Sequence, residues 1–260
     1  DPHGGAMDLR DGVVRAVGAA AERFREDYLR ILRGLRFASR FGFTIVPETW
    51  QAMREAAPGL AGLSAERIRD EWLKGLATAR EVAGLVGLWH ASGASAVVLP
   101  ELHEEVHLVA PDAPPRDPVL LTALLVDQPD SVLTRLRGSK VEIQRVARIV
   151  AGPAAPGGSN EEAVRRWLSR VGIAADDLLR AHQVRTGEPA PWLVAVEVIR
   201  ERGDALDRGA LAITGNDLAS AGLARGPAMG VLLERLLDEV LEDPTRNTRD
   251  RLLARARELA

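Results

Sequence analysis

The feature that most constrains the fold is the segment of residues 22–43, whose apolar side chains recur at helical spacing. The residues that gather on one side of this predicted helix are Phe24, Tyr28, Ile31, Leu32, Leu35, Ala38 and Ser39. Arginine and acidic side chains occupy the other side. Gly42 suits the left-handed conformation in which many helices end. The pattern therefore predicts one continuous helix that packs by its apolar face.

The opposite face of this helix carries an acidic residue beside a row of arginines. At about 100° per residue, Asp27 and Arg30 are neighbours, and Arg33 and Arg36 continue the row. On helix chemistry alone, a solvated surface is the simplest interpretation, since a Glu26–Arg30 ion pair adds only about 0.2–0.5 kcal/mol. The alternative is a binding face, because arginine offers a planar fork and a permanent charge to phosphate or a base edge.

Two further motifs flank this face and favour the binding interpretation. Residues 1–9 read DPHGGAMDL, residues 26–30 read EDYLR, and residues 66–71 read ERIRDE. This ordered trio resembles the class II tRNA nucleotidyltransferase and poly(A) polymerase family. In that comparison the first motif looks like the head–neck junction, the second like the nucleotide-selecting motif, and the third like the helix-supporting neck motif.

The resemblance implies a role for the arginine row in nucleotide binding. Asp27, Arg30, Arg33 and Arg36 become the candidate nucleotide-binding residues. Cytosine and adenine both present an exocyclic amine, a donor, beside an unprotonated ring nitrogen, an acceptor; uracil and guanine present the reverse order. Asp27 as acceptor and Arg30 as donor therefore match CTP and ATP and oppose UTP and GTP. No nucleic-acid template is needed for this choice.

The catalytic part of the family is missing from the sequence. The family's head contributes a GGxxRD turn and a DxD metal pair, and both precede the junction motif. We therefore expect no catalytic residue and no metal site within these 260 residues, and we expect the Mg²⁺ ligands in an absent head. The chain begins at Asp1, inside a family motif and without an initiator Met. It is thus expected to be a fragment, or what remains of a longer gene.

The resemblance returns near the end, at ITGNDL (residues 213–218) and GPAMG (residues 226–230). Pro227 is suited to the start of a helix, whose free N–H groups can hold a phosphate. By resemblance this tail binds the tRNA elbow, and the candidate RNA-binding residues are Arg225, Gly226, Gly230, Arg246 and Arg249. An ordinary helix start with glycine packing is the structural alternative.

Residues 103–107 read HEEVH, which matches the HExxH pattern of zinc hydrolases. That site needs both histidines on one face of a helix, together with a third ligand. Pro100 precedes the segment and a proline-rich loop begins at Pro111, which leaves little room for a helix. We therefore expect no zinc at His103 and His107, and a zinc hydrolase stays the least favoured function.

Composition sets broader limits. The hydrophobic fraction of 46% indicates a globular chain, and the formal net charge of −3 gives no global signal for nucleic-acid binding. The absence of cysteine excludes disulfides and thiolate chemistry. No apolar run is long enough to span a membrane and no signal peptide is visible, so we expect no membrane partner and a cytoplasmic location.

The expected fold is all-α, with a short N-terminal β-hairpin within residues 1–18. We expect four parts: a junction at residues 1–18, a neck at 19–80, a body at 81–185 and a tail at 186–260. The expected function is that of a portion of a template-independent tRNA nucleotidyltransferase, with CTP, ATP, tRNA and the head as partners. Whether the enzyme adds CCA, CC, A or poly(A) stays open. The alternative is a non-catalytic RNA-binding protein that lost its head.

Overall fold

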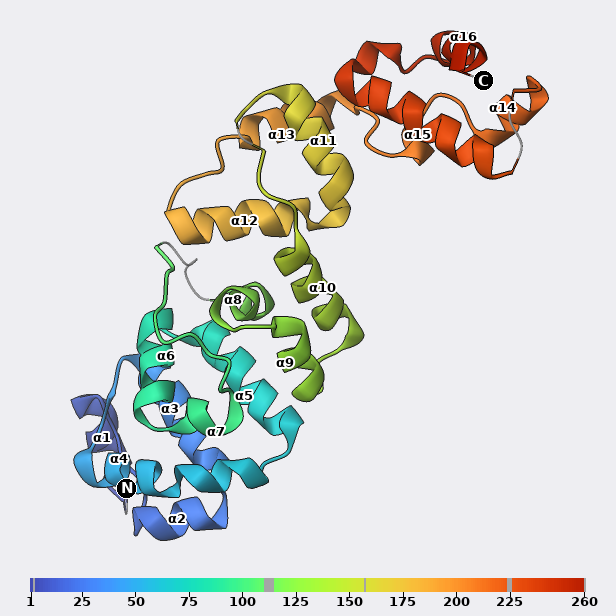
Figure 1. Ribbon diagram of the computed structural model, residues 1–260. Helices are drawn as coiled ribbons and strands as arrows, with labels where there is room; N and C mark the ends of the chain where they lie inside the picture. The colour runs from blue at the N-terminus through green and yellow to red at the C-terminus, as the bar shows by residue number, and fades with distance from the viewer. Residues whose placement is uncertain (2, 110–114, 157, 224–225, 260) are drawn as a thin grey trace. The chain divides into compact units, whose positions relative to one another are not determined.

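The computed structural model describes residues 1–260 except residues 2, 110–114, 157, 224–225 and 260. Helices dominate the described residues (Figure 1), and the all-α class expected from the sequence is confirmed. The chain forms two compact units. The first comprises residues 1–151 and 180–188, and the second comprises residues 152–179 and 189–260. The four-part division into junction, neck, body and tail stays a prediction.

The first unit contains most of the helices. Its elements are, in chain order and with η for a 3₁₀ helix, α1 (Gly5–Asp11), β1 (Val13–Val14), α2 (Ala20–Glu26), α3 (Leu29–Phe41), β2 (Thr44–Ile45), α4 (Pro47–Ala56), η1 (Ala57–Gly62), α5 (Ala65–Thr78), α6 (Val82–Ala91), α7 (Ala94–Val98), α8 (Pro118–Leu125), α9 (Pro129–Arg135) and α10 (Lys140–Ala151).

The elements of the second unit are α11 (Glu161–Val171), η2 (Gly172–Ala174), α13 (Leu193–Arg202), η3 (Arg208–Ala210), α14 (Gly215–Ser220), α15 (Pro227–Glu242), η4 (Pro244–Arg246) and α16 (Arg249–Leu259). Helix α12 (Ala175–Thr186) contributes residues to both units. No helix in the described part of the chain is both long and apolar enough to cross a membrane.

The expected N-terminal hairpin is wrong. Residues 5–11 form helix α1, whose first N–H groups, at Gly5 and Ala6, donate to the Asp1 carboxylate at 3.1 and 2.7 Å. Gly12 ends the helix in the left-handed region, with φ of 68°. Strand β1 follows and pairs in parallel with β2. Residues 5–11 therefore form an Asp1-capped helix and not a strand, and β1 pairs with a distant strand and not across a local turn.

The expected continuous helix over residues 22–43 is also wrong, because the chain breaks at Asp27. Asp27 is extended (φ −155°, ψ 102°) and lies between helices α2 and α3. Its Oδ1 accepts a hydrogen bond from the Leu29 N–H at 3.1 Å, an arrangement that competes with helical hydrogen bonding. The predicted end is confirmed: Gly42 is left-handed, with φ of 70°.

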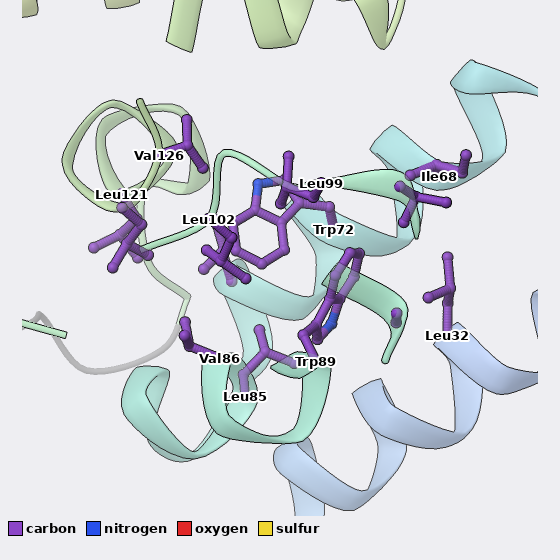
Figure 2. Close-up of a cluster of buried hydrophobic side chains, with 14 of the residues drawn as sticks. Leu32, Ile68, Trp72, Leu85, Val86, Trp89, Leu99, Leu102, Leu121 and Val126 are labelled. Atoms are coloured by element: carbon purple, nitrogen blue, oxygen red, sulfur yellow. The ribbon is translucent and has the colours of Figure 1, made fainter. Parts of the chain in front are cut away.

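The core of the first unit is built around two tryptophans (Figure 2). The Trp72 and Trp89 rings meet edge to face, with centroids 4.9 Å apart and planes at 68°. Both indoles are almost completely buried, and Trp72 Nε1 donates to Thr122 Oγ1 at 3.1 Å. This hydrogen bond joins α5 to α8 and satisfies a polar group that burial would otherwise penalise. The core thereby fixes α5, the helix that supports the candidate site.

Helix α8 begins at a carboxylate with two structural duties. Asp117 Oδ1 accepts from the Val119 and Leu120 N–H groups, both at 3.1 Å, and so caps the helix. The same carboxylate pairs with Arg145 on α10. Burial by itself would raise the pKa of Asp117, but the hydrogen bonds from Arg145, Leu120 and Val119 outweigh it and lower the pKa.

A buried arginine organises the second unit. The Arg165 side chain on α11 is only 5% exposed; its Nε donates to the Leu241 carbonyl at 2.7 Å and its Nη2 to the Glu242 carbonyl at 3.0 Å. These carbonyls end α15, where a cation is favoured. Asp204, itself 2% exposed, pairs with the same guanidinium at 3.4 Å. The contacts join α11, α15 and the end of α13.

We expect Asp117→Asn to lower the free energy of unfolding at pH 7 by about 1–3 kcal/mol, because it removes a helix cap and the partner of Arg145. A lowered folded-state pKa gives stability that is present above the ordinary value of 3.8 and is lost as pH falls through the folded pKa. The difference between variant and wild type, measured by urea denaturation, should therefore shrink below pH 3.8. Asp130→Asn, at an exposed aspartate of α9, is the control; a difference independent of pH would contradict this assignment.

Candidate functional site

The Asp27 carboxylate is held at the break between α2 and α3 from two directions. Arg67 Nη2, on α5, donates to its Oδ1 at 3.0 Å and its Oδ2 at 2.9 Å, while the Leu29 N–H donates to Oδ1. The Asp27 side chain is still 27% exposed. A carboxylate that is fixed but accessible can act as a hydrogen-bond acceptor for a ligand.

Arg30 is anchored on the other side of the junction. Its Nη1 donates to Glu26 Oε2 at 2.9 Å and to the Arg23 carbonyl at 3.2 Å. Glu26 also accepts from Arg23 at 3.0 Å, and the hydrogen bonds from Arg23 and then Arg30 lower the pKa of Glu26. The Glu26–Arg30 ion pair expected under the solvated-surface interpretation is thus present. It uses one nitrogen of Arg30.

Arg33 and Arg36 share a single buried carboxylate. Glu71 on α5 is 5% exposed; its Oε1 lies 3.4 Å from Arg33 Nε and its Oε2 lies 2.6 Å from Arg36 Nε. Arg36 is 13% exposed and its guanidinium lies 4.4 Å from the centroid of the Phe37 ring. Arg33 is 50% exposed. Arg33 is therefore accessible to a ligand, whereas Arg36 is mainly packed.

Helix α5 provides both supports from one face, because Arg67 and Glu71 are four residues apart. The sequence indicated a supporting role for residues 66–71 but did not identify Arg67 as the partner of Asp27. A signal was present in the sequence, because Arg67 and Glu71 are opposite in charge to the groups that they contact. Those groups are Asp27 for Arg67, and Arg33 and Arg36 for Glu71. Residues far apart in the chain are thereby combined into one site.

A pocket of about 450 Å³ lies beside this junction. It is lined by Val14, Arg15, Ala16, Val17, Arg23, Phe24, Arg30, Arg33, Gly34, Phe37, Thr49 and Met53. The lining therefore combines four arginines with mostly apolar residues. The volume falls in the range of roughly 300–1,000 Å³ that is usual for small-molecule sites.

The tail candidates do not all come together. Gly226 precedes α15, with Pro227 at its start as predicted, and Gly230 lies in its first turn. Arg246 instead lies within 4.0 Å of the Glu239 carboxylate in the last turns of the helix. An α-helix rises roughly 1.5 Å per residue, so the first turn of α15, with Gly230, is far from its last turns, beside Arg246. Arg225 lies outside the described residues.

Arg249 pairs with Asp217 Oδ1 at 2.6 Å, at the start of α14. Asp217 also closes a capping box with Thr214, and the hydrogen bonds from Thr214 lower the Asp217 pKa. Helices α14 and α15 are in contact, since a Cβ on Gly215 would lie 2.3 Å from Met229 Sδ. Arg249 is therefore linked through α14 to the first turn of α15.

The HEEVH segment is not helical, as the sequence predicted. His103 Nε2 lies 3.1 Å from Asp127 Oδ1, and His107 Nε2 lies 3.4 Å from Glu105 Oε2 on an exposed turn. Among the described residues, no three His, Cys, Asp or Glu side chains form a group that could hold a metal ion. These residues therefore do not fit a Mg²⁺ site, and the expectation of ligands in a head domain stays a prediction.

Two family models match the chain. One, described as "Probable RNA and SrmB- binding site of polymerase A", matches residues 42–106. The other, described as "tRNA nucleotidyltransferase domain 2 putative", matches residues 119–256, more than half of the chain.

Individual relatives agree with these models. The chain is 51% identical over 84 residues to the CCA-adding enzyme of Lactiplantibacillus plantarum, covering 32% of this chain and 21% of that protein. It is 31% identical over 264 residues to that of Levilactobacillus brevis, covering 96% and 65%. The chain thus spans less than two thirds of these curated relatives.

Solved structures share the fold. The CCA-adding enzyme of Bacillus stearothermophilus, solved in complex with CTP, matches with a TM-score of 0.83 and 26% identity, over 100% of this chain and 68% of that one. The Thermotoga maritima enzyme, solved with tRNA, shares the fold at a TM-score of 0.66 and 19% identity, covering 99% and 67%. Together with the model matched over residues 119–256, these similarities show that the chain belongs to the class II tRNA nucleotidyltransferase family, the family of the CCA-adding enzymes.

Proposed function

We propose that this chain is the nucleotide-selecting and tRNA-binding portion of a template-independent nucleotidyltransferase that adds CMP and AMP to the 3′ end of tRNA. The observation that carries the proposal is the helix junction at which Asp27 and Arg30 are each anchored by an oppositely charged side chain and still partly exposed. The relative solved with CTP supports a nucleotide as the ligand.

The anchoring contacts leave hydrogen-bonding capacity for a base. A carboxylate oxygen can accept two hydrogen bonds. Asp27 Oδ1 accepts from Leu29 and Arg67, whereas Oδ2 accepts from Arg67. Oδ2 thus keeps a lone pair for the exocyclic amine that cytosine and adenine share.

Arg30 supplies the complementary donor in this proposal. Its contacts with Glu26 and the Arg23 carbonyl both use Nη1, so Nε and Nη2 can donate to the ring nitrogen of cytosine or adenine. Uracil and guanine would bring a carbonyl toward Asp27 and an N–H toward Arg30. Each mismatch leaves a polar group unpaired, which supports strong discrimination.

Arg33 and Arg36 are proposed to extend the nucleotide site along α3. The exposure of Arg33 supports direct contact with a phosphate or sugar oxygen. Arg36 is more enclosed, and its bond to Glu71 supports a role in holding the row of arginines in place.

We propose that a catalytic head domain belongs to the same polypeptide and packs against this chain. Large apolar side chains lie exposed on α1, α3 and the segment between β1 and α2: Leu9 is 66% exposed, Val17 48% and Phe41 47%. These residues, with Phe37 and Phe43, line a second pocket of about 440 Å³. An apolar surface of this kind marks an interaction site. We propose that the head covers it and supplies the metal-binding carboxylates.

In an enzyme that joins this chain to a head, Asp27→Ala and Arg30→Ala should each lower kcat/KM for both CTP and ATP. The expected loss is on the order of 1–3 kcal/mol of transition-state stabilisation, since each variant leaves part of the base edge unpaired. Discrimination against UTP and GTP should fall as well. The measurement is kcat/KM for all four nucleotides.

Arg25→Ala is the matched control, because Arg25 is exposed on α2 and lies outside the pocket lining. Melting temperatures separate selection from folding. If either variant only melts earlier and keeps the wild-type ratios among the four nucleotides, the ion pairs at this junction are structural and the proposal fails.

We expect residues 1–260 by themselves to incorporate no labelled CMP or AMP into tRNA, because they contain no DxD pair. A separately purified head should restore part of the activity when added in trans. Leu9→Asp, which places a charge on the exposed apolar surface, should weaken this complementation. Incorporation by the 260 residues alone would contradict the proposal that the head supplies the catalytic residues.

The tail should bind tRNA through phosphates and without reading sequence. Arg249→Ala and Arg246→Ala should each weaken binding equally for different tRNAs and lower the salt slope by about 1. Filter binding at several salt concentrations provides the measurement, with Arg257→Ala on α16 for comparison. Unchanged affinity and slope in both variants would reduce these residues to partners of Asp217 and Glu239.

A further inference from the structure

The only tyrosine of the chain lies at the break between α2 and α3, between the two residues that are proposed to select the base. Tyr28 is the N-cap residue of α3 and directly follows Asp27. The Arg30 N–H donates to the Asp27 carbonyl at 3.1 Å, and the N–H of the next residue donates to the Tyr28 carbonyl at 3.0 Å. Tyr28 is therefore part of the turn that joins Asp27 to Arg30, and a shift of its backbone would move both.

The Tyr28 ring packs directly against Gly59 in η1. A Cβ atom added at Gly59 would lie 2.1 Å from Cε1, 2.2 Å from Cζ and 2.5 Å from Cδ1 of the ring. Carbon atoms in contact are roughly 3.5–4.0 Å apart, so a side chain at this position would displace the ring. The φ of Gly59 lies outside the left-handed region. The close approach of the ring, and not backbone strain, is therefore the reason that glycine is needed here.

The hydrophobic core fixes the elements on both sides of this contact. Leu60, next to Gly59, is completely buried, and Ala57 at the start of η1 is also buried. The same 3₁₀ helix contacts α4 and α7. Leu29, next to Tyr28, is buried in the same core cluster. Because protein interiors are close-packed, neither η1 nor the start of α3 can move away from the ring without loss of packing.

We infer that Tyr28 and Gly59 are positioning residues for base selection. The ring rests on the glycine and so sets where α3 begins, which fixes the spacing between the Asp27 carboxylate and the Arg30 guanidinium. The inference rests on the proposed function and adds two residues that act through this pair. Arg67 holds the Asp27 carboxylate from α5, whereas Tyr28 holds the backbone between the pair. A misplacement of about 1 Å in such a group can lower a rate on the order of a hundredfold.

The test is the ratio of kcat/KM for CTP to kcat/KM for UTP in the enzyme that joins this chain to a head. Gly59→Ala displaces the ring and should lower this ratio about tenfold. The matched control is Gly62→Ala in the same 3₁₀ helix, where an added Cβ meets nothing within 4 Å, and this variant should keep the wild-type ratio. Melting temperatures show whether each variant is folded. A wild-type ratio in folded Gly59→Ala would overturn the inference.

Variants of Tyr28 separate ring packing from a general effect on stability. Tyr28→Leu removes the ring carbons nearest Gly59, so it should lower the ratio by itself, and Gly59→Ala should cause no further loss in that background. Tyr28→Phe keeps the ring and should recover the ratio that Tyr28→Leu loses. An equal effect of Gly59→Ala with and without the ring would overturn the inference. If Gly59→Ala does not fold, Tyr28→Leu decides, because a wild-type ratio in that variant is equally contrary to the inference.

Fluorine NMR of the 260-residue chain tests the contact itself. Because Tyr28 is the only tyrosine, labelling with fluorotyrosine gives a single resonance. Gly59→Ala should shift this resonance, whereas Gly62→Ala should leave it at the wild-type position. An unshifted resonance in folded Gly59→Ala would show that the ring does not rest on η1, and the inference would be wrong.

These outcomes differ from those that test the proposed function. The proposed function fails if Asp27→Ala and Arg30→Ala leave the nucleotide ratios unchanged. The positioning role fails if those two variants change the ratios while Gly59→Ala and Tyr28→Leu do not.

Discussion

The candidate site depends on the ionic contact between α3 and α5. Burying the Glu71 carboxylate would cost several kcal/mol if it stood alone, and the two arginine Nε groups at 2.6 and 3.4 Å offset that cost. One helical turn away, Arg67 holds Asp27. Trp72, which follows Glu71 on α5, is buried in the core and bonded to Thr122. The core therefore holds α5, and with it Arg67 and Glu71, in place.

This arrangement is compatible with both interpretations of the charged face. The Glu26–Arg30 pair is the exposed ion pair that helix chemistry predicts, and it contributes little to stability. It also fixes one nitrogen of Arg30 and thereby reduces the entropy that a ligand would have to remove from this side chain. An ion pair can thus position a recognition group without being important for folding.

Much of the local structure was predictable, because its causes lie within a few residues. Gly42 ends α3 by adopting a conformation that costs glycine little, and Pro47 and Pro227 begin helices where a missing N–H does no harm. The prolines around HEEVH similarly exclude a helix there. The all-α class followed from apolar periodicity, and family membership followed from three motifs in order.

The sequence by itself determined which residues carry charge, that a helix ends at Gly42 and which family the chain resembles. Only the tertiary structure decided that the helix breaks at Asp27, since its partner Arg67 lies forty positions away on α5. Likewise, β1 pairs with β2, which follows α3 in the sequence, so the local hairpin expected in residues 1–18 does not form. Apolar periodicity depends only on residues that are close together in the sequence. It cannot show that the Asp27 carboxylate pairs with a guanidinium on another helix, because that contact forms only when α3 packs against α5.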